Sequence, residues 1–272
     1  MSIFYFAISH PVNFNQELAA RETWASKINI TWYSTVPSFS DTVIVSAEPN
    51  TYANIFERVL KVWSHVNRVQ QGYDWYVRLW PDNYVFSERL ETVLKTLNPE
   101  IPQIVGRTRD FMGTTYVEGG AGCALSRTGF DKWIEQHGLS LTGCKIPIWL
   151  PEEDSYAEDV ITSNCLRGAG VRFTDRSDTF LSHSLGLEAI ENVSVKELAN
   201  GTLVSIGTLH YMTATQMMSI WREELGVSHF SFPSVHLWFR VVGLRRALRR
   251  RLPTRCEKIQ RAKPSETEFR QL

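Results

Sequence analysis

Short apolar runs alternate with amphipathic stretches along the first half of the chain. Period-two or continuous apolar patterns predict buried strands at residues 3–9, 30–35, 42–47 and 73–79. Helical periodicity predicts helices at 15–26, 52–69 and 87–97. Ser87 is the residue expected to cap the last of these helices. Such an alternation of strands and helices is typical of an α/β fold with a largely parallel sheet.

The strand at 73–79 leads into a turn that holds a single acid. In the sequence YDWYVRLWPDNYVF, residues 73–86, the alternating apolar positions stop at Leu79 and Asp82 follows between Pro81 and Asn83. Ligands of open α/β sheets bind outside the carboxyl ends of the strands. Asp82 is therefore a candidate binding residue.

The second half adds a strand at 104–109, a glycine cluster at 118–126 and a helix at 127–138. Glu158 and Asp159 open a further helix, where the capping of free backbone amides is an alternative to a catalytic role. A strand at 202–212 ends near His210, and a lone histidine in that place can equally be structural.

Composition indicates a globular chain. Its 272 residues are 43% hydrophobic and 12% aromatic, which suffices for one large domain at 1–230 with an appendage at 231–272. The sequence contains no apolar run of the length that spans a membrane, and we interpret its first residues as a strand and not a targeting signal. The four cysteines lack CxxC spacing, which argues against a zinc site and leaves ordinary thiols as the simplest interpretation.

The zero net charge conceals a basic carboxyl-terminal tail. Residues 240–272 contain eleven Lys and Arg against three acids, which leaves the remainder acidic. Apolar residues recur there at helical spacing among arginines, as in a helix that lies on an anionic membrane surface. A terminal helix docked on the acidic body, or an arm for nucleic acid, has the same composition. We expect the membrane surface as partner and no nucleic acid.

Five motifs in register resemble a known family. The segments RETW at 21–24, the 73–86 stretch, GGAGCALS at 119–126, EDVITSNCLRGAGV at 158–171 and GTLHYM at 207–212 are similar to those of the Fringe-like glycosyltransferases of family 31. The likeness is greatest to the core 1 β1,3-galactosyltransferases and extends over residues 3–226.

The resemblance implies a GT-A fold, a Rossmann-like sheet that binds a nucleotide sugar with a divalent cation, usually manganese. The family's three consecutive aspartates map to Trp80, Pro81 and Asp82, so one acid remains. By the same likeness, Asp82 and His210 would bind the metal, and Asp159 would be the general base with Glu158 beside it. The residues that the resemblance places near the donor are Asp82, Arg78, Gly119, Gly120 and Arg21.

The implied activity is transfer of a hexose from a UDP-sugar to a hydroxyl of a sugar acceptor, with inversion and with a β1,3 linkage as the family default. The physical scheme is sound, because substrate oxygens and water can complete the shell of a cation that has few protein ligands. The loss of two acids leaves an alternative, a non-catalytic chaperone or binding protein on the same fold.

The acceptor and the compartment are further expectations. The segment before His210 is short and has no aromatic residue, so recognition of a glycoprotein does not carry over from the core 1 enzymes. The basic tail favours a cytoplasmic protein on the membrane periphery that extends a lipid-linked glycan, as in surface polysaccharide assembly. The alternative is the Golgi lumen, for which Cys144 and Cys165, which resemble a disulfide pair of the core 1 enzymes, would be suited.

Overall fold

The structure, a computed structural model, describes residues 1–45, 54–138, 143–150, 157–182, 207–210 and 212–225. A seven-stranded sheet forms its centre, in the order β10-β6-β9-β4-β1-β2-β3. The bounds of these strands are β1 Ile3–Ile8, β2 Ile30–Ser34, β3 Val43–Ile44, β4 Trp75–Leu79, β6 Gln103–Gly106, β9 Cys123–Ser126 and β10 Arg172–Asp175. All pairings are parallel except those of β9, which runs antiparallel to β4 and β6. The predicted α/β class with a mostly parallel sheet is confirmed.

Two smaller sheets accompany the central one. The first contains β5 Tyr84–Val85, β11 Phe180–Leu181 and β12 Thr208–Leu209, with β12 antiparallel to β5 and parallel to β11. The second is a hairpin of β7 Thr108–Phe111 and β8 Thr114–Val117. At the hairpin turn Met112 has a φ of 50° and Gly113 a φ of 74°, the left-handed region that a glycine adopts without strain.

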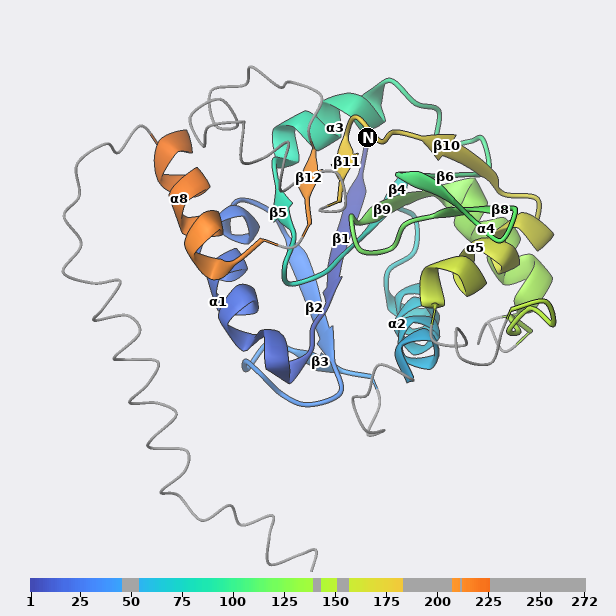
Figure 1. The fold of residues 1–272 in the computed structure, drawn as a ribbon, viewed down its shortest axis with the longest axis horizontal. Helices are drawn as coiled ribbons and strands as arrows, with labels where there is room; N and C mark the ends of the chain where they lie inside the picture. The colour runs from blue at the N-terminus through green and yellow to red at the C-terminus, as the bar shows by residue number, and fades with distance from the viewer. Residues whose placement is uncertain (46–53, 139–142, 151–156, 183–206, 211, 226–272) are drawn as a thin grey trace, which may run out of the picture. The chain divides into compact units, whose positions relative to one another are not determined.

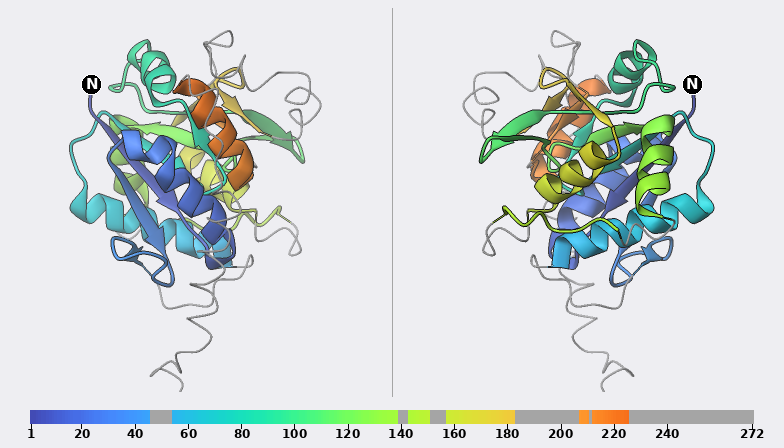
Figure 2. Two further views of the ribbon diagram at one scale, coloured as in Figure 1. Left: turned by 90° about the vertical axis from the view of Figure 1, so that its left-hand side faces the viewer. Right: turned by 90° about the vertical axis from the view of Figure 1, so that its right-hand side faces the viewer.

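Helices cover both faces of the central sheet (Figure 1). Their bounds are α1 Phe14–Glu22, α2 Ile55–Val69, α3 Ser87–Lys95, α4 Arg127–His137, α5 Glu158–Gly168 and α8 Ala214–Glu224. Figure 2 shows α1 and α8 in front of the sheet from one side and α2, α4 and α5 from the other. None of the described helices is both long and apolar enough to cross a membrane.

The strands alternate their side chains between two cores, as a period of two requires. Tyr5 and Val77 contribute to the core beneath α1, α3 and α8, whereas Phe6 and Tyr76 contribute to the core beneath α2, α4 and α5. In the second core Trp63 of α2 lies edge-on to Phe6, with ring centroids 4.8 Å apart. Burial of these aromatic rings on both faces fixes the register of the central strands.

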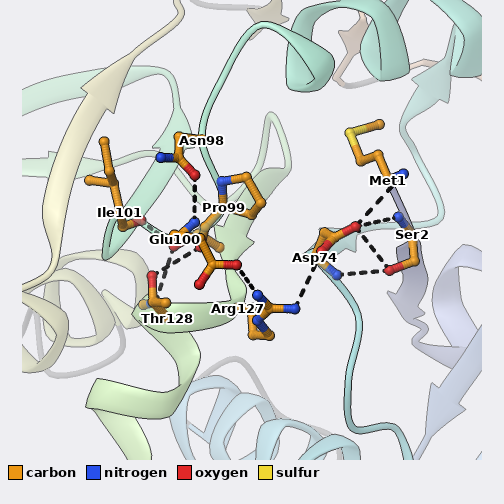
Figure 3. Close-up of polar contacts among 11 residues, drawn as sticks. Met1, Ser2, Asp74, Asn98, Pro99, Glu100, Ile101, Arg127 and Thr128 are labelled. Atoms are coloured by element: carbon orange, nitrogen blue, oxygen red, sulfur yellow. Dashed lines mark hydrogen bonds and ion pairs between the residues drawn. The ribbon is translucent and has the colours of Figure 1, made fainter.

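A polar network closes the amino-terminal edge of the sheet (Figure 3). The backbone amide of Ser2 donates to Asp74 at 2.7 Å, and Arg127, which begins α4, forms an ion pair with the same carboxylate at 3.5 Å. Arg127 also pairs with Glu100. Asp74 precedes β4, and Ser2 precedes β1, so the network joins the starts of these two central strands. Their carboxyl ends lie at the opposite edge of the sheet.

The predicted elements mostly agree with the structure, with differences at their ends. The N-cap prediction for Ser87 is wrong, because Phe86 occupies the cap position, Ser87 is the first helical residue and no side chain caps this helix. The expected strand at 104–109 is divided, since β6 ends at Gly106 and β7 follows. The predicted tail at 231–272 and most of the strand expected at 202–212 lie outside the described residues.

Candidate functional site

A cavity of about 440 Å³ opens at the carboxyl edge of the central strands. It is bordered by the segments that follow β1 and β4, by the loop before β9, by the first turns of α2 and α5, and by the residue after β12. Because β9 runs antiparallel, its amino-terminal loop reaches the edge at which the parallel strands end. The lining residues are His10, Val12, Asn13, Ile55, Arg58, Trp80, Asp82, Glu118, Gly120, Glu158, Asp159 and His210.

Asp82 and His210 lie side by side in this cavity. Antiparallel pairing places Leu209 opposite Tyr84, and the amide of Met212 donates to the carbonyl of Asp82 at 2.8 Å. The imidazole Nε2 of His210 is 3.5 Å from Oδ2 of Asp82. The structure therefore brings together the two predicted metal ligands, which are far apart in the sequence.

The turn that carries Asp82 is held by its neighbours Trp80 and Asn83. The Asn83 side chain is buried, accepts from the Trp80 amide at 2.7 Å and donates to the carbonyl of Gly120 at 2.9 Å. The indole N–H of Trp80 donates to the carbonyl of Gly119 at 3.0 Å. Trp80, which occupies the first of the family's three acid positions, and Asn83 thus hold the Asp82 turn against the glycine loop. These two roles were not predicted from the sequence, and an asparagine in a turn is too common to indicate one.

The two glycines of that loop make room for side chains. A Cβ atom at Gly120 would overlap the imidazole of His210, and one at Gly119 would overlap the Arg78 guanidinium and the Glu158 carboxylate. The resemblance places both glycines near the donor, and that role stays a prediction. The described contacts show that the loop packs closely on His210 and on a buried ion pair, which requires glycine at both positions.

That ion pair joins Arg78 on β4 to Glu158 at the start of α5. Nη1 of Arg78 donates to Oε2 of Glu158 at 2.8 Å, and both side chains are buried. Burial alone would lower the pKa of Arg78, but the charge of Glu158 raises it above its ordinary value. Arg78 does not line the cavity, so its predicted contact with a donor would require a change in this pairing.

Asp159 lines the cavity next to the ion pair. Its Oδ2 accepts from the Gly119 amide at 3.2 Å, and its Oδ1 accepts from the Val160 amide at 2.9 Å. Burial, and then the charge of Glu158, raises the pKa of Asp159 to about 6. A carboxylate with this pKa is ionised at neutral pH and is basic enough to accept a proton from a hydroxyl. Helix capping explains only part of its contacts, since one of them reaches the glycine loop.

Arg21, predicted to lie near the donor, is engaged elsewhere. It forms ion pairs with Glu17 at 2.9 Å and Asp41 at 2.7 Å, and its guanidinium lies 4.6 Å from the ring centre of Trp32. It is not among the residues that line the cavity. The donor role of Arg21 stays a prediction, and the described contacts account for it as a structural residue.

The Asp82–His210 pair fits a divalent cation such as Mn²⁺. Burial disfavours the ionised carboxylate of Asp82 and raises its pKa to about 6. A bound cation would offset this effect by stabilising the ionised carboxylate. Carboxylate oxygens suit manganese, and the neutral imidazole of histidine is the commonest protein ligand of metal ions. No cluster of three or more His, Cys, Asp or Glu side chains with metal-binding geometry occurs among the described residues. Substrate oxygens and water would therefore supply the rest of the coordination shell.

Comparisons with known proteins identify the family of the chain. The family model described as Fringe-like matches residues 19–224. Glycoprotein-N-acetylgalactosamine 3-beta-galactosyltransferase 1 of Xenopus laevis is 29% identical over 107 residues, which are 39% of this chain and 27% of that protein. The chain thus aligns with about a quarter of the curated relative.

Two solved structures are more distant. A glycosyltransferase involved in the glycosylation of the major capsid of PBCV-1 is 15% identical, with a TM-score of 0.43 over 83% of this chain and 100% of its own. The galactosyltransferase LgtC, solved with donor and acceptor sugar analogs, is 11% identical, with a TM-score of 0.40 over 85% of this chain and 98% of its own.

The close packing of the glycine loop predicts that a methyl group added at Gly120 destabilises the protein. Gly120→Ala should lower the free energy of unfolding by about 1–3 kcal/mol, because the new Cβ overlaps the His210 ring. The matched control is Gly168→Ala at the end of α5, where a Cβ meets nothing within 4 Å. Urea denaturation would measure both, and equal stability of the two variants would contradict the described packing.

Proposed function

Because the chain belongs to the Fringe-like family, we propose that it is an inverting glycosyltransferase that moves a hexose from a UDP-sugar to a hydroxyl of a sugar acceptor. The observation that supports this most is the convergence of Asp82, His210 and Asp159 on one cavity at the carboxyl edge of the sheet. The proposed reaction needs a site for a cation and a proton acceptor in the same cavity. Asp82 and His210 are suited to the first role, and Asp159 is suited to the second.

Asp159 would act as the general base. Its carboxylate takes the proton of the acceptor hydroxyl while the hydroxyl oxygen forms a bond to the anomeric carbon from the side opposite UDP. The bond from that carbon to the UDP oxygen breaks, and UDP leaves with the electron pair. The Gly119 and Val160 amides hold the carboxylate in place, and Glu158, paired with Arg78, keeps its pKa raised. A cation held by Asp82 and His210 would stabilise the negative charge on UDP.

Galactose and a β1,3 linkage are the finer parts of the proposal. They come from the name of the curated relative, a 3-beta-galactosyltransferase, and from the resemblance of the motifs. A non-catalytic binding protein on the same fold remains the alternative, and it predicts no sugar transfer from any UDP-hexose.

The acceptor and the location are also proposals. A lipid-linked glycan on an anionic membrane is supported by the basic tail, whose residues lie outside the described part of the chain. The structure contains a disulfide between Cys144 and Cys165, as the resemblance implied, so the expectation of ordinary thiols is wrong for these two cysteines. Disulfides persist in oxidising compartments, so this bond supports the lumenal alternative over the cytoplasmic one.

Asp159→Asn provides the first test. It should reduce transfer from UDP-galactose, UDP-N-acetylglucosamine or UDP-glucose at least about 100-fold, within the range that general-base catalysis contributes, while UDP affinity changes little. The matched control is Asp131→Asn on the exposed face of α4, which should retain the parental rate. Release of UDP with acceptor present measures the rate, and calorimetry measures affinity. Transfer at the parental rate by Asp159→Asn would refute the assigned base.

Removal of either proposed metal ligand gives a second test. Asp82→Asn and His210→Ala should each abolish the increase in UDP affinity that manganese produces, because each removes one of the two protein ligands. The measurement is UDP titration with manganese and with a chelator. Asp110→Asn on the hairpin, an exposed acid, should keep the manganese effect. An unchanged manganese effect in both site variants would place the ion elsewhere.

The raised pKa of Asp159 predicts the pH dependence. The base acts when ionised, so transfer should fall as the pH drops through about 6 and reach a plateau above it. In Glu158→Gln a raising charge is lost and Arg78 is left without its partner, so the acidic limb should move to lower pH. The measurement is kcat/KM against pH for both proteins, with circular dichroism to verify folding. A limb that stays in place in Glu158→Gln would exclude Asp159 as its origin.

A further inference from the structure

Arg58 is a buried cation at the cavity with unused hydrogen-bond donors. It lies in the first turn of α2, is 6% exposed and borders the cavity. Its Nε and Nη1 atoms are buried and have no hydrogen-bond partner among the described residues. Buried guanidinium groups are ordinarily paired, so an arginine in this state is suited to bind an anion that the described residues do not supply.

The acids of the cavity do not serve as that partner, because each is engaged elsewhere. Glu158 pairs with Arg78 at 2.8 Å, and Glu118 pairs with Arg109 at 2.8 Å. Asp82 lies against His210, and Asp159 accepts from two backbone amides. Arg58 therefore borders the cavity, and none of these acids forms a described ion pair with its guanidinium.

The energetic balance agrees with a missing anion. Burial lowers the pKa of Arg58, and the charge of Glu158 offsets only part of this effect. The pKa of Arg78, which is more deeply buried but in direct contact with Glu158, is raised instead. Burial thus makes the charged form of Arg58 less favourable than it is in water, and an anion that lies against the guanidinium would stabilise that form.

We propose that Arg58 binds a diphosphate group in this cavity and supplies a part of its affinity that does not depend on metal. The planar guanidinium can donate two parallel hydrogen bonds to phosphoryl oxygens. The inference rests on the proposed function, since a UDP-sugar brings such a group. The inference is also consistent with the short acidic motif, because Asp82 is the single acid among the three positions 80–82. With fewer carboxylates near the phosphates, a basic side chain of the protein would offset more of the phosphate charge.

The diphosphate has two possible sources, the UDP of the donor and the diphosphate of a lipid-linked acceptor. Calorimetry measures the binding of UDP, uridine and inorganic pyrophosphate, each with a chelator and with manganese. Comparison of the three ligands separates the part of the affinity that comes from the phosphates from the part that comes from the nucleoside. The variants are Arg58→Met and the matched control Arg68→Met, an exposed arginine in the last turn of the same helix.

We expect Arg58→Met to weaken pyrophosphate binding in chelator about 10- to 100-fold, the loss of a charge-assisted hydrogen-bonded contact. UDP binding should weaken by the same factor where the donor is the source of the diphosphate, and uridine binding and the Arg68→Met control should be unaffected. The variant should also unfold at the same or a higher denaturant concentration than the parent, since it removes an uncompensated buried charge. A clear loss of stability together with unchanged pyrophosphate affinity would instead make Arg58 a structural residue and overturn the proposal.

Kinetics identifies the source and separates this inference from the proposed function. A raised KM for the UDP-sugar assigns Arg58 to the donor, and a raised KM for a diphosphate-linked acceptor with unchanged UDP affinity assigns it to the acceptor. Sugar transfer that is equal in parent and Arg58→Met refutes the Arg58 site and leaves the transferase standing. Absence of transfer in the parent, with pyrophosphate binding that depends on Arg58, refutes the transferase and leaves the site.

Discussion

The buried ion pair between Arg78 and Glu158 determines much of the arrangement around the cavity. It connects the central strand β4 to the first turn of α5, and each charge compensates the other, so that removal of either side chain would leave an uncompensated buried charge. The pair occupies the space that Gly119 leaves by lacking a side chain, and its acid raises the pKa of Asp159. Because it engages Glu158, it also leaves Arg58 without a contacting acid.

Much of the fold could be predicted from the sequence, because apolar periodicity reports burial directly. The segments 3–9 and 30–35 became β1 and β2 almost as expected, and the stretch at 52–69 became α2 apart from its start. The Asp82–His210 pair could be predicted only through resemblance, since no local pattern connects residues joined by the pairing of β12 with β5.

Other features of the site depend on tertiary contacts that a single sequence does not encode locally. Resemblance could place Arg78 near the donor, but its partner Glu158 comes from a helix eighty residues away. Resemblance could also place Gly119 and Gly120 near the donor, yet the groups that pack against them are side chains of the protein itself. Arg58 gave no signal, because a basic residue in an amphipathic helix is expected at its surface.

The reversed direction of β9 has a consequence for variation among such proteins. β6 ends and β9 begins at the same edge of the sheet, and the hairpin of β7 and β8 is inserted between them. Glu118, just after this hairpin, reaches the cavity. Changes at the base of the hairpin, where Glu118 lies, would therefore alter the cavity lining in a connecting segment and leave the central strands uninterrupted.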